Sequence, residues 1–372
     1  MNIKIAHLTS VHPRFDPRIF VKMCSSLAEK QKYDVNLIVA DGKGDENINN
    51  VQIFDVGKKA KGRVVRVLKT PLKIFRKAEE LDCDIYHLHD PELIPIGLKL
   101  KKMGKKVIFD AHEDFSRQIL GKPYLNKYIA IFLAKIIDFY EKKSLNKFDC
   151  IVAATIFIRD RYSSINNTCI NINNYPIVGE LDQRITWSDK KNEVCYIGAI
   201  SKSRGIDEMV KALRYVEGVR LNLGGRFIKS KLKSKITSYD EWEHVNEMGF
   251  LDRDDIKSVL KKSKAGLVVL HPTINYKDAL PVKMFEYMAA SIPVISSNIP
   301  LWTDIVNSNE CGVCVDPLNP KEISNAIEYL INNPIEAKKM GENGKNAVIR
   351  KFNWSIEEVK LLECYNRLTL VN

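Results

Sequence analysis

The sequence predicts an α/β protein built from two open parallel sheets, each with helices on both faces. Three observations lead to this fold class: the length of the chain, an alternation of short apolar runs with helical segments in the first half, and a second series of the same kind in the second half. The 372 residues exceed what one ordinary hydrophobic core needs. Apolar residues make up 45% and charged residues 28%, which is typical of soluble globular proteins.

The first half carries five short β-rich runs, with helix-like segments at 18–31 and 92–103. Near-continuous apolar strands separated by helices predict a parallel, doubly wound sheet. The apolar segment 128–140 is short and contains Lys135 and Asp138, so we expect a core helix there and no membrane span. The five runs are 3–10, 34–40, 84–89, 106–112 and 150–155.

A polar, irregular stretch at 166–192 separates the first series from a second one, and part of it is expected to be a linker. Two such sheets bind ligands at the carboxyl ends of their strands. The second series has runs at 193–201, 219–225, 265–271, 292–297 and 311–316, followed by a helix at 353–370. The predicted parts are a domain at 1–175, a linker at 176–192, a domain at 193–352 and a terminal helix at 353–372 that returns to the first domain.

The net charge of +12 is concentrated in the first half, where residues 1–180 hold 30 Lys/Arg against 21 Asp/Glu. Segment 58–77 alone has nine basic residues, no acid and interleaved apolar residues. It is either a solvated helix face or a surface that attracts anionic lipid, with nucleic acid as a third alternative. The N-terminus enters a strand pattern without a cleavable signal, which favours a cytoplasmic protein.

Metal chemistry has little support in the sequence. Of eight cysteines, only Cys311 and Cys314 form a CxxC, and no second pair completes a ligand set, so we expect buried, reduced thiols. The "DCD" at 82–84 precedes a strand and is expected to be a turn. The "DRDD" at 252–255 is expected to start a helix.

The stretch "DALPVKMFEYM" places two carboxylates around the start of a predicted helix. Backbone N–H groups near Ala279 and Leu280, with the helix dipole, favour a diphosphate. Asp278 and Glu286 can accept hydrogen bonds from sugar and ribose hydroxyls. Alternatively, Asp278 caps the helix and Glu286 pairs with a nearby Lys or Arg.

Two further groups follow predicted strands. In "GAISKSRG", Gly198 permits close backbone approach, and Lys202 and Arg204 place cations beside the same phosphates. Polar residues also end the strands of the first domain, where a core would prefer apolar ones. They are His12, Arg14 and Asp16 in the first loop, His89 and Asp90 after the third run, and His112 and Glu113 after the fourth. Asp16 also fits an ordinary helix N-cap.

Together, "TSVHPRFDPRIF", "YHLHDPELI", "YIGAISKSRGID" and "LPVKMFEYMAASIPVISS" resemble the family 4 retaining glycosyltransferases, whose GT-B fold has two facing Rossmann-like domains. The resemblance covers nearly the whole chain. Within the family, the chain is similar to bacterial enzymes of surface-polysaccharide synthesis. The resemblance implies that Glu286 holds the nucleotide ribose and Asp278 the donor sugar. It further implies roles for Ala279, Leu280 and Arg204 at the diphosphate, Phe250 and Leu251 at the base, and His112 at the reacting sugar. We also expect Gly198 and Lys202 at the donor site, and His12, Arg14, Asp16, His89 and Asp90 on the acceptor side.

The sequence departs from the family pattern at several points. Asp278 stands where the family has glutamate, Ala199 where many members have arginine, and Ser291 where glycine is usual. The segment "VHPRFDPR" replaces the glycine-rich first loop of many members. We therefore expect Arg204 and Lys202 to carry more of the diphosphate charge.

The resemblance implies transfer, with retention, of a sugar from a UDP- or GDP-sugar to a hydroxyl of a glycan. The expected acceptor is linked to a polyprenyl diphosphate, in capsule, O-antigen or exopolysaccharide synthesis. We expect no cofactor, no metal and no nucleic acid, and peripheral binding to the anionic inner face of the cytoplasmic membrane. The alternatives are a GT-B nucleotide-sugar epimerase and an inactive basic scaffold at the membrane.

Overall fold

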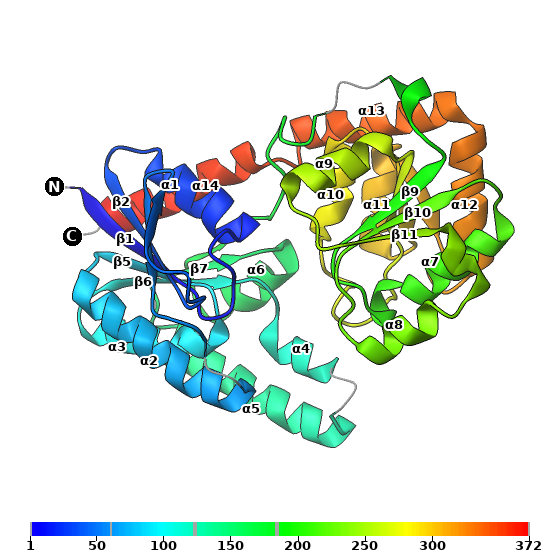
Figure 1. Ribbon diagram of the computed structural model, residues 1–372. Helices are drawn as coiled ribbons and strands as arrows, with labels where there is room; N and C mark the ends of the chain where they lie inside the picture. Colours follow the sequence, from blue (N-terminus) through cyan, green and yellow to red (C-terminus); the bar gives the residue numbers. More distant parts are fainter. Residues whose placement is uncertain (1, 60–61, 122–124, 183–185, 371–372) are drawn as a thin grey trace. The chain divides into compact units, whose positions relative to one another are not determined.

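The structure is a computed structural model that describes residues 2–59, 62–121, 125–182 and 186–370. It divides into two compact units (Figure 1). The first unit is Met1–Asn174 with Ile356–Asn372, and the second is Tyr175–Ser355. The expected linker at 176–192 belongs to the second unit, and its Leu181 lies in a core of that unit.

The first unit contains an eight-stranded sheet in the order β3-β4-β2-β1-β5-β6-β7-β8. All neighbouring strands are parallel except β3 and β4. The five expected strands are present, and β3, β4 and β8 were not anticipated. The strands are β1 (Ile3–Leu8), β2 (Tyr33–Val39), β3 (Glu46–Ile48), β4 (Val51–Asp55), β5 (Ile85–Leu88), β6 (Lys106–Ala111), β7 (Cys150–Ala153) and β8 (Cys169–Asn171).

Helices cover both faces of this sheet. Ala6, Leu8 and Leu88 belong to one apolar core together with residues of α2 and α3. On the other face α14 packs on the sheet, since its Tyr365 hydrogen-bonds to His7 and His87 of β1 and β5 (Figure 1). The helices of the first unit are the π-helix η1 (Pro17–Cys24), α1 (Ser25–Ala28), α2 (Arg63–Leu81), the 3₁₀ turn η2 (Pro91–Leu93), α3 (Ile94–Lys102), α4 (Phe115–Leu120), α5 (Lys127–Leu145), α6 (Ile156–Ser163) and α14 (Trp354–Leu370), whose first two residues belong to the second unit.

The second unit contains a six-stranded parallel sheet in the order β11-β10-β9-β12-β13-β14. The five expected strands are present, and the edge strand β11 was not anticipated. The strands are β9 (Glu193–Ile197), β10 (Arg220–Gly224), β11 (Val245–Gly249), β12 (Ala265–Val268), β13 (Val294–Ser297) and β14 (Gly312–Val315).

Two apolar cores lie on the two faces of the second sheet. One includes residues of α9, α10, α11 and α13, and the other residues of α7, α8 and α12. The helices of the second unit are η3 (Trp187–Asp189), η4 (Lys202–Arg204), α7 (Ile206–Ala212), η5 (Leu213–Tyr215), α8 (Ser230–Ile236), η6 (Asp240–His244), α9 (Arg253–Lys262), α10 (Val282–Ala289), α11 (Pro300–Ser308), α12 (Pro320–Asn332) and α13 (Pro334–Arg350).

Helix α5 differs from the expectation of a core helix. The segment is helical, but it presents a series of large apolar side chains to solvent. Phe132 and Phe139 are 64% and 65% exposed. The exposed set is Tyr128, Ile129, Ile131, Phe132, Ile136, Phe139 and Tyr140. Within the described residues, no helix combines the length and the apolar character that a membrane span requires.

Several smaller expectations are confirmed. Asp82 ends α2 in a left-handed turn before β5, and Asp252 caps α9 through a capping box. The eight cysteines are free thiols, six of them buried.

Candidate active site

Polar side chains gather at the carboxyl ends of β1, β5 and β6 in the first unit. Asp90, which follows β5, is buried and accepts hydrogen bonds from the loop after β1. Its Oδ2 atom accepts from Thr9 Oγ1 (2.9 Å), from the Ser10 backbone N–H (2.6 Å) and from Ser10 Oγ (3.2 Å). Asp90 therefore fixes the first β–α loop to the neighbouring strand.

Asp110, near the end of β6, is the charged centre of this cluster. It accepts two hydrogen bonds from the buried guanidinium of Arg18, at 2.9 and 2.7 Å. His89 Nδ1 lies 3.0 Å and His112 Nε2 2.8 Å from Asp110 Oδ2. Burial alone would raise the pKa of Asp110, but Arg18 and His112 hold it well below its usual value. Asp110 is thus a carboxylate that fixes two histidine rings.

A chain of hydrogen bonds leads from Asp110 to the C-terminal helix. His89 Nε2 lies 2.9 Å from His7 Nδ1, and His7 Nε2 lies 3.2 Å from the Tyr365 hydroxyl, which lies 2.9 Å from His87 Nδ1. Burial lowers the pKa of His89 to about 3 and that of His7 and His87 well below 6.5. These neutral rings each carry one proton, so the direction of every bond is fixed from Asp110 outward.

The fixed direction determines what His112 can offer. Its Nε2–H donates to Asp110, so its Nδ1 atom is left to meet a ligand. The His112 side chain is 22% exposed, whereas His89 and Asp110 are fully buried. His112 is thus the member of the chain that a substrate can reach.

His12 and Asp16 lie beside this chain. His12 Nδ1 is 3.1 Å from Asp16 Oδ2, and the His12 ring lies 4.9 Å from that of His112. Asp16 accepts the backbone N–H groups of Arg18 and Ile19, which confirms the N-cap role. Burial would raise the pKa of Asp16, but its bond with His12 and these N–H groups bring it to about 2. Burial would lower the pKa of His12, yet the neighbouring carboxylates raise it.

Arg14 does not join the cluster. Its buried guanidinium donates to Asp41 (2.8 and 2.7 Å), Glu46 (2.7 Å) and the carbonyl of Gly44 (2.9 Å). These four bonds hold the loop between β2 and β3. The structure therefore gives Arg14 a structural role, in contrast to the expected role at an acceptor.

Two sets of ligand atoms in the cluster are close enough for a metal ion: His7, His87 and His89, and His89, Asp110 and His112. In the first set, the chain of hydrogen bonds occupies both ring nitrogens of His7 and of His89. His87 Nε2 is the ring nitrogen of that set that is buried without a partner. An ion there would have to replace most of these bonds.

In the second unit, "GAISKSRG" forms the turn after β9. Gly198 has φ +137° and Gly205 φ +76°, conformations that side chains other than glycine rarely adopt. The Arg204 guanidinium is partly buried, with Nη1 3.3 Å from the Ala199 carbonyl and Nε 3.4 Å from the Tyr276 hydroxyl. Lys202 is exposed. One cation of this turn therefore lies within the fold and the other in solvent.

The loop before α10 is fixed by a hydrogen bond from a buried tryptophan. Trp302, fully buried, donates its indole N–H to the Ala279 carbonyl at 2.7 Å. The Ala279 N–H donates to the Tyr276 carbonyl at 3.2 Å. Contrary to the expectation, this N–H is therefore not free to bind a diphosphate. Pro281 directly precedes α10, and it, not Asp278, is the N-cap residue of that helix. Within the described residues, the Leu280 N–H has no acceptor.

Glu286 pairs with an arginine that the sequence did not single out. Arg253 Nη1 lies 2.6 Å from Glu286 Oε1, and Arg253 Nε lies 2.7 Å from Glu180 Oε1. This pairing matches the alternative left open for Glu286. The second carboxylate oxygen of Glu286 is not part of this bond, so a ribose hydroxyl can still be accepted there. The "DRDD" segment, which starts α9, therefore also supplies a site residue.

Lys283 is a second residue that the sequence analysis passed over. It lies in the first turn of α10, three residues before Glu286. Its Nζ atom is buried and has no hydrogen-bond partner, and it lies 3.6 Å from the centre of the Tyr196 ring. A basic residue within the apolar run "LPVKMFEYM" was the signal that could have revealed it.

The segment expected at the base lies after β11. Phe250 is 69% exposed, with the Arg226 guanidinium 5.2 Å from the centre of its ring. Leu251 packs against the core and would meet any side chain placed at Gly224. Next to it, a Cβ atom at Gly225 would lie 1.8 Å from the Gly198 carbonyl oxygen. Glycine at 225 therefore allows the β10 loop to touch the turn after β9.

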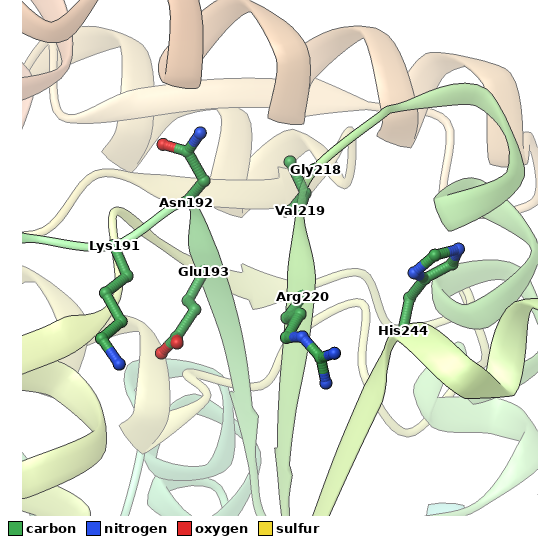
Figure 2. Close-up of a pocket in the computed structure, with 7 residues that line it drawn as sticks. All are labelled: Lys191, Asn192, Glu193, Gly218, Val219, Arg220 and His244. Atoms are coloured by element: carbon green, nitrogen blue, oxygen red, sulfur yellow. The ribbon is translucent and has the colours of Figure 1, made fainter.

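The structure also has a pocket of about 320 Å³ at the opposite edge of the second sheet (Figure 2). Lys191 and Asn192 precede β9, Gly218 and Val219 precede β10, and His244 precedes β11. These are the amino ends of the strands, whereas open α/β sheets bind ligands at the carboxyl ends. We therefore assign the pocket no part in the site.

Sheets of this kind, with polar sites at the carboxyl ends of both, define a protein of the GT-B class. Two family models match the chain: "Glycosyltransferase Family 4" over residues 18–169 and "Glycosyl transferases group 1" over residues 178–347. The chain belongs to the family 4 glycosyltransferases, as the motifs indicated.

Individual proteins agree with this assignment. A glycosyltransferase of Methanocaldococcus jannaschii is 22% identical over 396 residues, covering 95% of each chain. The capsular polysaccharide biosynthesis glycosyltransferase CapM of Staphylococcus aureus is 27% identical over 177 residues, covering 46% of this chain and 45% of CapM. The crystal structure of Anabaena HepE in complex with UDP-glucose matches with a TM-score of 0.74 at 12% identity, covering 98% of this chain and 100% of HepE.

Proposed function

We propose that this glycosyltransferase moves a sugar from a UDP- or GDP-sugar to a hydroxyl of a surface-polysaccharide intermediate, with retention at the anomeric carbon. One observation carries the proposal: the turn after β9 and helix α10 bring Arg204, Lys283 and Glu286 to one edge of the second sheet. Cations suit a diphosphate, and a carboxylate suits ribose hydroxyls. The similarity to HepE, solved with UDP-glucose, and to CapM supports this substrate class.

The proposed chemistry uses groups of the protein and of the donor. Negative charge develops on the β-phosphate as the sugar leaves, and Arg204 together with the Leu280 N–H stabilises it, so no metal is required. His112 orients the donor sugar through Nδ1, held in place by Asp110. The acceptor attacks from the side of the leaving group, and the phosphate takes its proton.

A lipid-linked acceptor and peripheral membrane binding complete the proposal. Exposed apolar residues of α5 recur at 128, 132, 136 and 139, which places them on one helical face, and α5 also carries lysines. Helix α2 adds the exposed residues Val65, Leu68 and Leu72 beside Lys69 and Lys73. Lys61 of the same basic segment lies outside the described residues. Such a pairing of apolar and basic residues fits an anionic lipid surface.

Calorimetric titration with UDP, GDP, ADP and CMP in the presence of EDTA tests the donor site. We expect one nucleotide to bind, and binding to fall sharply in Glu286→Ala. Glu328→Ala, an exposed glutamate of α12 in the same unit, is the matched control and should bind as the wild type does. A folded protein that binds none of the four would overturn the proposal.

Product analysis separates transfer from the two alternatives. With the nucleotide-sugar that binds, we expect turnover that requires an added glycan acceptor, and an α-linked product from an α-linked donor. Conversion of the donor without acceptor would identify an epimerase, and binding without any turnover would favour the scaffold.

Vesicle sedimentation tests the membrane part. We expect binding to anionic vesicles at low salt and loss of binding in Phe132→Ser/Phe139→Ser. Ile335→Ser, which changes an apolar side chain of α13 that is 81% exposed, is the control. Equal binding to neutral and anionic vesicles, or an unchanged double variant, would refute this surface.

A further inference from the structure

The buried ammonium of Lys283 is an unusual feature of the second unit. A lysine ammonium has three donors, and a buried cation is costly unless it is paired and hydrogen-bonded. Within the described residues, Lys283 Nζ has no hydrogen-bond partner and contacts the face of the Tyr196 ring. A cation–π contact offsets only part of the desolvation. The fold therefore holds this ammonium at a cost that the unliganded protein does not recover.

The surroundings of Lys283 make a cation less favourable still. An ideal Cβ atom at Gly198 would lie 2.9 Å from Lys283 Nζ and 3.6 Å from Arg204 Nη1, so both cations border the same glycine. Lys283 also stands in the first turn of α10, where the helix dipole repels positive charge. Burial and the charge of Arg204 lower the pKa of Lys283 well below its usual value. An anion beside Gly198 would reverse each of these effects.

The carboxylate nearest in sequence is engaged elsewhere. Glu286 contributes an attraction to Lys283, but its hydrogen bond goes to Arg253. The turn after β9 itself supplies one inward cation, Arg204, because Ala199 ends in a methyl group and Lys202 is exposed. Lys283 therefore provides from the helix the second positive charge that this turn lacks.

We propose that Lys283 binds the diphosphate of the sugar donor and stabilises the departing β-phosphate. The inference rests on the proposed function and adds a catalytic residue to it. In the transfer, the bond from the anomeric carbon to the β-phosphate oxygen breaks and leaves its electron pair on that oxygen. The acceptor oxygen bonds to the anomeric carbon, and the acceptor proton passes to the phosphate. Lys283 and Arg204 balance the charge of the nucleoside diphosphate that results.

Calorimetric titration of three ligands with the preferred base tests this role: the nucleoside, its monophosphate and its diphosphate. In Lys283→Met, which keeps the length and removes the charge, we expect affinity for the diphosphate to fall about 10- to 100-fold. Affinity for the nucleoside should change less than about 2-fold, since base and ribose contacts stay. Lys283→Arg should retain most of the diphosphate affinity, and kcat should follow the same order.

Lys321→Met is the matched control, because Lys321 also lies over a tyrosine ring, that of Tyr215, but on α12. Circular dichroism checks that each variant is folded. If Lys283→Met does not fold, Lys283→Arg tests the role of the charge. Wild-type diphosphate affinity in Lys283→Met would overturn the inference and leave the proposed function standing. Equal losses for nucleoside and diphosphate would also overturn it, since Lys283 would then shape the pocket. A wild-type protein that binds no nucleotide would remove the proposed function itself.

Discussion

At the carboxyl ends of the first sheet, Asp110 accepts hydrogen bonds from three side chains, and the next links reach as far as Tyr365 on α14. At the corresponding edge of the second sheet, Lys283 donates none. The first cluster thus pairs its buried charged groups from within and, among the buried and described atoms of its histidine rings, leaves only His87 Nε2 without a partner, whereas at the second edge the amino group of Lys283 has no partner. This difference is what we expect if His112 is positioned before any substrate arrives and the proposed diphosphate completes the second site.

The largest expected effect is a loss of stability at low pH that is greater in the first unit than in the second. His7, His87 and His89 have folded pKa values below the value of about 6.5 in an unfolded chain. Their contribution to stability is complete above pH 6.5 and is lost as the pH falls toward the folded values, about 3 for His89. Each adds at most about 1.4 kcal/mol per pH unit to the loss. His12, with a raised pKa, acts in the opposite direction.

Fluorescence and circular dichroism can measure this separately for the two units. All four tryptophans lie in the second unit, so their fluorescence reports its unfolding, whereas circular dichroism reports both. As the pH is lowered from 7.5 to 5, we expect the urea midpoint measured by dichroism to begin to fall at a higher pH than the midpoint measured by fluorescence. Coincident midpoints at every pH would remove the contrast.

The second prediction concerns the charge at the centre of the first cluster. Asp110→Asn leaves the buried guanidinium of Arg18 without its counter-ion. We expect the free energy of unfolding of the first unit to fall by about 3–5 kcal/mol, measured by urea denaturation. Asp82→Asn, at an exposed pair with Lys105, should leave the midpoint unchanged. A small loss in Asp110→Asn would mean that Arg18 finds another acceptor.

The third prediction concerns the far end of the hydrogen-bond chain. Tyr365→Phe removes the hydroxyl that joins His7 to His87 and leaves buried ring nitrogens unsatisfied. We expect a loss of about 1–2 kcal/mol by urea denaturation followed by dichroism. Tyr329→Phe, on the exposed side of α12, is the control. An unchanged midpoint would show that the chain contributes nothing to stability.

The smallest effect has the opposite sign. Lys283→Met removes a buried, unpartnered cation, so we expect the unliganded second unit to gain about 1 kcal/mol by urea denaturation followed by fluorescence. Lys321→Met should change little. A loss of stability would contradict the view that the second edge is incomplete without a ligand.

Prediction from the sequence worked where apolar runs mark buried strands, as in all ten that were expected. It failed at β3, β8 and β11, which are short, polar or partly exposed edge strands with no such run, and also at the inner strand β4. It also failed for α5, because apolar content does not show whether a face is covered. The motifs singled out His112, Arg204 and Glu286, which the structure places beside Asp110, in the turn after β9 and on α10, and their roles stay predictions.

The residues it missed depend on partners distant in the sequence. Arg18 meets Asp110 across 92 positions, and His87 meets Tyr365 across 278. Arg253 precedes Glu286 by 33 positions and lies on another helix. No local spacing reveals such pairs. Lys283 was visible within its motif, but its burial became apparent only in three dimensions.

The position of Tyr365 has a consequence for how the protein is made. The second unit, Tyr175–Ser355, is inserted in the chain between the two parts of the first unit. A ribosome therefore delivers the partner of His7 and His87 only after the whole second unit has been synthesised. Domains generally fold as units during synthesis. The first unit is therefore the first to be started on the ribosome and the last to be completed. Until α14 has been synthesised, His7 and His87 lack the Tyr365 hydroxyl as a hydrogen-bond partner.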